Sequence, residues 1–326
     1  MNRWYRWALA ALVLGIGAIV WSILARTEPP PATLFVAAAA APLAVVFGVL
    51  GRMGGRLPTP ALIGGAILGP LVAVVGHAAV FAFAAAFLLG FFEAGRSLLE
   101  ELRVDPRITD IMASPWLLLV LVDASVVAPL TEETGKALGA RLARPSSRRE
   151  AFLAGAAAGA GFAIVENVLY ALAGAVFGGP WTAIVVARAM GAAVHPLASG
   201  LVVAGWWDAR HGGGARALGR GFLAGAGVHA LWNGTTVALA VAETAIRVRG
   251  APGMMGVASL AFTAALGVVA AAALWAVSGS VIAGRDPSSA VRVSEARTMA
   301  AWIVLAASLL VPVAVLILAF PSVYLG

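Results

Sequence analysis

The sequence contains no cysteine and few charged residues. The lack of cysteine excludes disulfide bonds, thiolate metal ligands and a cysteine nucleophile. Charged residues make up 11% of the 326 residues and hydrophobic residues 61%, which is far from the composition of a soluble globular domain. We therefore expect an integral membrane protein of the all-α class, a polytopic bundle of transmembrane helices surrounded by the lipid bilayer, without a soluble domain.

The basic charge of the chain does not indicate a nucleic-acid partner. The formal net charge is +7 and the pI is about 11.1, but the arginines stand in short groups between apolar stretches instead of forming one basic stripe. Such groups are typical of the cytoplasmic connections of membrane proteins. We interpret the arginines as topology signals and predict no contact with nucleic acid.

Nine apolar runs have about the length of a membrane span, and they cover approximately residues 7–25, 32–50, 60–92, 115–140, 151–177, 181–207, 218–245, 253–284 and 299–321. The first run follows Arg3 and Arg6 and is expected to be a retained span, because it is long for a signal peptide. The third run is too long for one untilted span. It can tilt, extend beyond the bilayer or break near Gly76 and His77.

The arginines predict the orientation of these spans. A cytoplasmic N-terminus places fourteen arginines in the inner connections and six in the outer ones, and this excess favours an N-in, C-out topology. The segment from Glu93 to Ser114 mixes charges with leucine and isoleucine. We interpret it as an amphipathic helix on the outer surface.

Polar residues interrupt four consecutive apolar runs. They are Glu132, Glu133 and Lys136, then Glu166 and Asn167, then Arg188 and His195, and finally His229 and Asn233. A charged residue at the centre of a span costs about 2.5–3.5 kcal/mol on insertion scales. Several of them in consecutive spans therefore favour a shared functional site.

The spacing lets each helix turn its polar residues to one face. Glu132 and Lys136 are four residues apart, as are His229 and Asn233, and residues at this spacing share a helix face. Pro129 lies beside this cluster, as does Pro196, and each proline removes a backbone hydrogen bond. We expect one polar cluster near mid-membrane with a local opening for water.

Other notable residues have simpler interpretations. His77, alone in the third run, is expected to be a hydrogen-bonded packing residue. Four glycines at four-residue spacing predict close helix packing. These are Gly155, Gly159, Gly221 and Gly225.

At the polar residues the sequence resembles the PrsW family of intramembrane proteases. Residues 132–136, Glu-Glu-Thr-Gly-Lys, fit the family's E-E-x-x-K motif, and residues 162–167 fit F-x-x-x-E-N. Arg188 and His195 are similar to an arginine and a histidine of the next helix, and residues 229–233 resemble an H-x-x-W-N element. The four motifs follow the family's order and cover about residues 115–245.

The resemblance implies an intramembrane endopeptidase that acts on single-spanning membrane proteins, such as anti-sigma-factor-like regulators. In the related type II CAAX prenyl endopeptidases, a glutamate activates water, and a later histidine and asparagine stabilise the oxyanion. Such roles suit these residue types, since a carboxylate can accept a proton from water and polar N–H groups can stabilise a developing negative charge.

By this resemblance six residues are candidates for catalysis. Glu132 or Glu133 is the expected general base, Glu166 and His195 help to hold the water, and His229 and Asn233 supply the oxyanion donors. Lys136, Asn167 and Arg188 are expected to support them, the two cations by limiting repulsion among the carboxylates.

The sequence leaves two possibilities for a metal ion. Two histidines with carboxylates can bind zinc, but an H-E-x-x-H motif and cysteine ligands are absent. We predict a metal-free, glutamic-type site without a cofactor and keep a zinc-dependent site as the alternative.

Two other classes of function fit part of this pattern. Intramembrane ionisable residues also mark proton and ion pathways, which predicts a transporter with flux and no cleavage. A non-catalytic membrane scaffold predicts stable partners and no turnover. Against transport, no inverted repeat is evident and the polar residues gather in one depth band.

We divide the chain into three parts. Residues 1–114 hold the N-terminal spans and the surface segment, residues 115–245 form a catalytic four-helix core, and residues 246–326 hold two C-terminal spans. The expected location is the cell membrane, with multiple passes.

Overall fold

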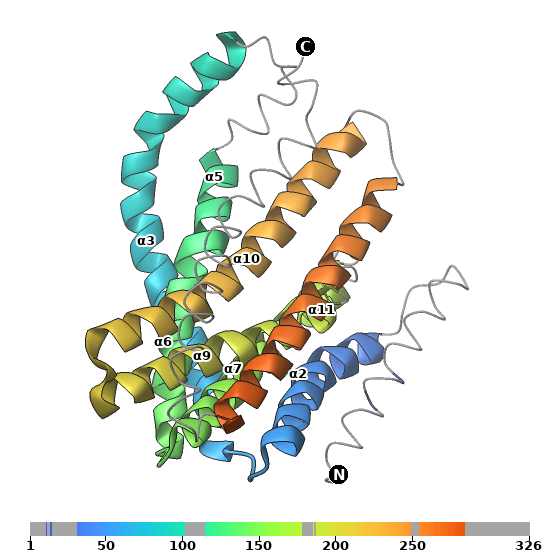
Figure 1. Cartoon of the computed structure of the whole chain (residues 1–326). Helices are drawn as coiled ribbons and strands as arrows, with labels where there is room; N and C mark the ends of the chain where they lie inside the picture. The colour runs from blue at the N-terminus through green and yellow to red at the C-terminus, as the bar shows by residue number, and fades with distance from the viewer. Residues whose placement is uncertain are drawn as a thin grey trace.

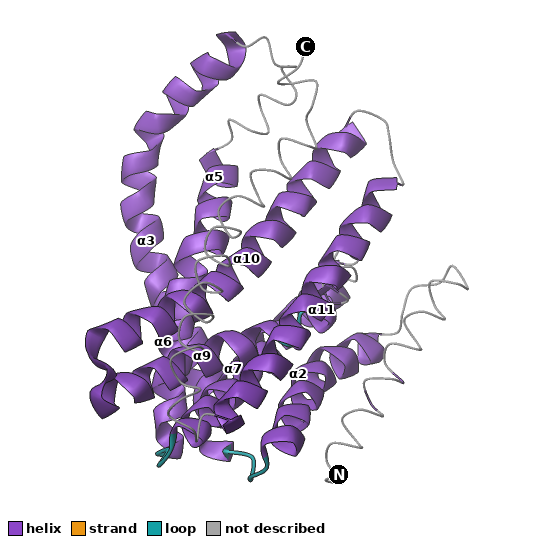
Figure 2. Ribbon diagram, in the orientation of Figure 1, coloured by secondary structure: helices purple, strands orange, loops and turns teal. Residues whose placement is uncertain are grey.

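The computed structural model describes residues 31–101, 115–177, 187–248 and 254–283, together with Ala11, Leu14 and Val185. Within these residues every element is a helix (Figure 2), which confirms the all-α class. The predicted last span, 299–321, lies outside the described residues, as does the first, 7–25, apart from Ala11 and Leu14.

The helices follow one another along the chain as Figure 1 labels them. They are α2 (Pro31–Met53), α3 (Thr59–Glu101), α5 (Pro115–Val122), the π-helical turn η1 (Asp123–Val127), α6 (Ala128–Ala140), the 3-10 turn η2 (Arg141–Ala143), α7 (Arg148–Phe177), α9 (Val194–Asp208), the π-helical turn η3 (Ala209–Gly213), α10 (Gly214–Val248) and α11 (Met254–Ala283).

The third apolar run forms part of one unbroken helix. α3 has 43 residues and passes through Gly76 and His77 without a break, so the break considered there is wrong. The helix also continues past Glu93 to Glu101, so the first part of the predicted surface segment is helical and extends α3, and its place on the outer surface stays a prediction. Glycine inside a helix costs only about 1 kcal/mol, which the long apolar helix tolerates. The remainder of that predicted segment, 102–114, lies outside the described residues.

Two predicted spans are interrupted near their prolines. The run 115–140 contains the turn η1 directly before α6, whose first turn holds Pro129. The run 181–207 is not one helix, because residues 191–193 form a turn and α9 begins at Val194, two residues before Pro196. Proline lacks the N–H that a continuous helix needs and fits best in a first turn. The expected irregular backbone beside the polar residues is therefore confirmed.

α7 is the central helix of the described bundle. α2, α3 and α9 all pack against it, and 72% of its apolar segment is buried, against 17% in α3. A Cβ atom on Gly155 would collide with the Ser199 carbonyl of α9, and one on Gly159 with the His195 carbonyl. Gly221 and Gly225 of α10 approach the backbone of α9 in the same way, so the predicted packing role of the four glycines is confirmed.

Two described helical segments are long and apolar enough to cross a membrane by length and composition, namely residues 59–82 and 148–172. The count of nine spans and the N-in orientation stay predictions. The same is true of the three-part division, although α3 of the first part packs along α6 and α7 of the second.

Candidate active site

All nine predicted site residues meet in one network inside the described helices. α6 contributes the glutamate pair and the lysine, α7 contributes Glu166 and Asn167, and α10 contributes His229 and Asn233. Arg188 precedes the turn at 191–193, and His195 follows it at the start of α9. Most of these side chains are almost fully buried. Buried charges need ionic or hydrogen-bonding partners, and the network supplies them.

Lys136 is the centre of the network. Its ammonium donates to Glu133 Oε1 at 2.7 Å and lies 3.3 Å from Glu132 Oε2. It also lies 3.0 Å from Nδ1 of His195 and 4.1 Å from the centre of the Phe162 ring. The lysine therefore connects α6 with α7 and α9.

Glu133 has partners on both carboxylate oxygens. Oε1 faces Lys136 and lies 3.1 Å from Nδ1 of His229, and Oε2 accepts a hydrogen bond from Ser199 Oγ at 2.7 Å. The side chain is fully buried. Glu133 is thus held in place by three other side chains.

Glu132 differs from its neighbour. Its Oε2 atom is buried and, among the described residues, has no hydrogen-bond partner. The ammonium of Lys136 lies 3.3 Å away and Nε2 of His229 3.5 Å away. An oxygen without a hydrogen bond, close to a cation and an imidazole, remains able to accept a proton or bind a ligand.

The contacts of His229 select one tautomer of its ring. A carboxylate can only accept hydrogen bonds, so the contact between Nδ1 and Glu133 Oε1 requires a proton on Nδ1. Nε2 then carries the lone pair and accepts a hydrogen bond from Nδ2 of Asn233 at 3.1 Å. The same nitrogen lies 3.5 Å from Glu132 Oε2.

Arg188 organises the other side of the network. Its Nη2 atom is paired with Glu166 Oε2, and its Nε atom donates to Asn167 Oδ1 at 2.7 Å. Asn167 Nδ2 in turn donates to the carbonyl of Ala38 in α2 at 3.0 Å. Nε2 of His195 lies 3.2 Å from Glu166 Oε2. Arg188 and Asn167 are thus placed to support Glu166 and His195.

The sequence did not single out Ser199, which joins the network through Glu133. It lies four residues after His195 and so on the same face of α9. That spacing was a usable signal. His77, by contrast, lies apart from the network and pairs with Asp123 of η1, with 3.1 Å between Nδ1 and Oδ1.

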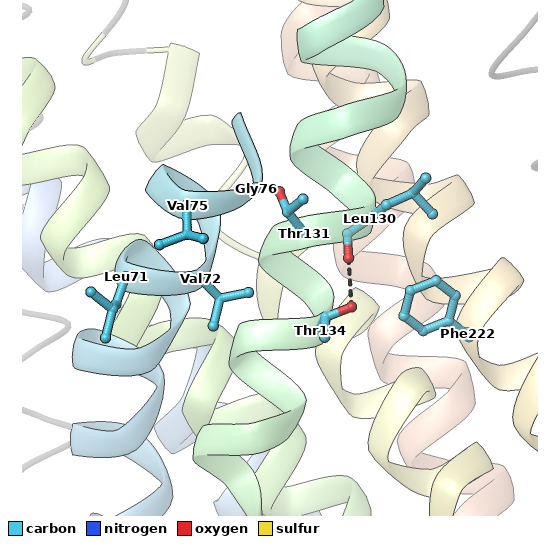
Figure 3. A pocket seen from close by; sticks show the side chains of 8 residues that line it. All are labelled: Leu71, Val72, Val75, Gly76, Leu130, Thr131, Thr134 and Phe222. Carbon is cyan, nitrogen blue, oxygen red and sulfur yellow. Dashed lines mark hydrogen bonds between the residues drawn. The ribbon is translucent and has the colours of Figure 1, made fainter. Parts of the chain in front are cut away.

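An apolar cavity of about 570 Å³ lies between α3, α6 and α10 (Figure 3), and its lining residues are Leu71, Val72, Val75, Gly76, Leu130, Thr131, Thr134 and Phe222. The α6 residues that line it stand on the face of the helix opposite Glu132 and Lys136. The Thr134 hydroxyl donates to the Leu130 carbonyl of its own helix at 2.7 Å. The cavity therefore presents apolar surface and contains none of the predicted site residues.

The comparison with protein families decides what kind of protein carries this network. A family model described as PrsW family intramembrane metalloprotease matches residues 57–265. The chain belongs to the PrsW family. It is accordingly an intramembrane protease, a hydrolase of the membrane, as the motifs implied. The match begins two residues before α3 and ends in α11, beyond the residues 115–245 that carry the PrsW motifs. No curated protein and no solved structure matches the chain.

The PrsW description as a metalloprotease makes the metal-binding capacity of the network relevant. Glu132, His195 and His229 each offer one ligand atom, and these atoms lie within 4.8 Å of one another. Two histidines with one glutamate are a known ligand set of catalytic zinc. The buried Glu132 oxygen that lacks a hydrogen bond suits such a role. The lone pair of His229 would become a ligand once the Asn233 amide released it. The donor set fits a divalent metal ion, and the metal-free site stays a prediction.

Proposed function

We propose that the chain is a multi-pass enzyme of the cell membrane that hydrolyses peptide bonds of membrane-anchored proteins, with Glu132 as the proton acceptor. The observation that carries this proposal is the difference between the two neighbouring glutamates. Both oxygens of Glu133 are engaged, whereas Glu132 Oε2 has no hydrogen-bond partner among the described residues. A general base needs a free lone pair within reach of water.

Glu133 then has a positioning role. Its contacts with Lys136, Ser199 and His229 fix the orientation of the imidazole and of the ammonium. A carboxylate that orients a histidine in this way is common behind reactive centres. Removing its charge would release both partners.

Asn233 is the oxyanion donor that we favour. One N–H of its amide binds Nε2 of His229, and a primary amide has a second N–H that can bind a developing oxyanion. His229 itself has its lone pair on Nε2 in this tautomer. The oxyanion role predicted for it would need the other tautomer or the imidazolium.

Glu132, His195 and His229 are the residues that would hold a metal ion. A bound divalent ion would polarise a water molecule or the substrate carbonyl as a Lewis acid. The carboxylate of Glu132 has two oxygens, so one can serve as a ligand while the other accepts a proton.

The proposal includes the predicted topology and partner. Nine spans with the N-terminus in the cytoplasm would bring the polar cluster to the interior of the bilayer, where a single-spanning substrate could reach it. Membrane-anchored regulators such as anti-sigma-factor-like proteins are the expected substrate class. The PrsW membership supports this substrate class. The arginine distribution supports the topology.

The test compares membrane proteomes of cells that express equal amounts of the native protein, Glu132→Gln or Thr134→Ala. Thr134 is the matched control, because it lies on α6 but faces away from the network. We expect new N-termini from a single-spanning protein with the native chain and with Thr134→Ala, and none with Glu132→Gln. If all three profiles agree although Glu132→Gln inserts and folds, this site does not hydrolyse peptides, and flux or partner binding has to be measured instead.

A further inference from the structure

Lys136 is unusual in the sequence as well as in the structure. Of the 22 lysine and arginine residues in the chain, it is the only lysine. Its side chain is fully buried. Arginine carries a wide planar fork, whereas lysine ends in a compact ammonium with three donors. Lysine therefore places a compact ammonium at the centre of the network.

The ammonium has the surroundings of a bound cation. Oxygen atoms of Glu133 and Glu132 lie 2.7 and 3.3 Å from Nζ, and Nδ1 of His195 lies 3.0 Å away. The ring of Phe162 lies 4.1 Å away on a further side, where its face attracts positive charge. Two carboxylates, one imidazole and one aromatic face thus enclose a single positive group.

The contact with His195 uses the lone pair that a metal ion would need. Nε2 of His195 lies 3.2 Å from both Glu166 Oε2 and Arg188 Nη2. An ammonium can only donate, so the contact of Lys136 with Nδ1 leaves the proton of a neutral ring on Nε2, where Glu166 accepts it and Arg188 cannot donate. Nδ1 consequently holds the lone pair, and the ammonium donates to it. The lysine also contacts Glu132, so it touches two of the three residues that could hold a metal.

We propose that the Lys136 ammonium and a divalent metal ion are alternative occupants of the same set of ligand atoms. A metal ion binds nitrogen and oxygen ligands at about 2.0–2.2 Å, inside the space that Nζ now shares with Glu132 and His195. Two cations so close together repel each other strongly in a buried site. Lys136 thereby sets how tightly the site binds metal: the metal enters when the lysine swings away from these two residues.

The proposal predicts the effect of removing the charge. In Lys136→Met a neutral side chain of similar length replaces the ammonium, and affinity for zinc should rise by about tenfold or more, because the competing cation is gone. Lys136→Arg keeps the charge and should bind zinc no more tightly than the native protein. Adding Glu132→Gln to Lys136→Met should abolish the gain, since one ligand is lost.

The experiment titrates the full-length chain with zinc in detergent micelles and measures bound metal by elemental analysis after removal of free ions. A clearly higher affinity of Lys136→Met than of both other forms supports the proposal. Equal affinities, no binding by Lys136→Met, or tighter binding by the native protein would each overturn it. The readout is metal content and not cleavage.

A second measurement serves if Lys136→Met does not fold. The single lysine gives one resonance in native protein labelled with ¹³Cε-lysine, and this resonance should shift as zinc binds. A resonance that stays unchanged while zinc binds stoichiometrically shows that the metal and the ammonium do not compete. The competition between lysine and metal rests on the proposed function only in assuming that this network is the active site. Loss of cleavage in Glu132→Gln together with equal zinc affinities would retain the protease and reject the competition.

Discussion

Single side chains in the network are tied together through the oxygens of Glu133. Removing one donor from a buried carboxylate leaves an unsatisfied charged oxygen, which costs more than the hydrogen bond contributed. Ser199 is the donor to Oε2, and both residues are fully buried. Its hydroxyl is therefore more important than that of a serine which only bonds its own helix.

Ser199→Ala should lower the free energy of unfolding by about 1–3 kcal/mol. Cleavage should fall but persist, because Ser199 acts only through Glu133. Thermal unfolding in one detergent, with the cleavage rate measured alongside, checks both expectations. Thr134→Ala is the control, since its hydroxyl bonds only the Leu130 carbonyl of its own helix. An equal loss of stability in the two variants would contradict a special role for Ser199.

At the residue scale the sequence predicted which residues meet but not which role each of them has. Four-residue spacing on α6 and α10 was enough to bring Lys136 and Asn233 to the network. Glu132 and Glu133 are neighbours, and only the packing of Ser199 and His229 around one of them distinguishes the two. Ser199 itself was missed, although its spacing from His195 placed it on the same helix face, because serine in a membrane helix often bonds its own backbone.

At the scale of helices, the contact between α3 and α6 positions the glutamates. Gly135 stands inside the E-E-x-x-K motif and faces α3. A Cβ atom there would lie 2.7 Å from the Leu68 carbonyl oxygen and 2.9 Å from Val72 Cβ. The small residue lets α6 approach α3 closely enough to bury Glu133 and Lys136.

Gly135→Ala should destabilise the protein by about 1–3 kcal/mol, although alanine is the better helix former by about 1 kcal/mol. The clash moves α6, so cleavage should fall as well. Gly219→Ala in α10 is the matched control, because a Cβ atom there would meet nothing within 4 Å. The free energies of unfolding of both variants, measured in the same detergent, check this expectation. A Gly135→Ala protein as stable as Gly219→Ala would show that the α3–α6 contact is not tight.

Helix type was predictable, whereas helix ends were not. Apolar composition over long runs predicted helices throughout, but it cannot mark where α3 ends, since the mixed residues after Glu93 also suit a helix. The prolines were better guides. Pro129 and Pro196 predicted irregular backbone, and η1 and the turn at 191–193 lie directly before the helices that contain them.

At the scale of the whole molecule, one ion pair relates two distant connections. Arg148 at the start of α7 donates to Asp208 at the end of α9, with 2.7 Å between Nε and Oδ1. The connection between α6 and α7 therefore lies at the same end of the bundle as the turn η3. α10 begins at that end and has 35 residues, so it is about 52 Å long, more than the hydrocarbon core of about 30 Å.

This arrangement, together with the predicted cytoplasmic N-terminus, predicts how single cysteines react with a maleimide when they are introduced into a chain that has no cysteine of its own. Ser146→Cys and Ala215→Cys should resist a membrane-impermeant maleimide in intact cells and react after permeabilisation, because both positions would face the cytoplasm. Met254→Cys, beyond the far end of α10, should react in intact cells. The native protein is the blank. If Ser146→Cys and Ala215→Cys differ in accessibility, the two connections lie on opposite sides of the membrane, which contradicts the packing of the helices described above. If all three positions show the opposite accessibility, the arrangement of the helices is retained and only the orientation predicted from the arginines is reversed.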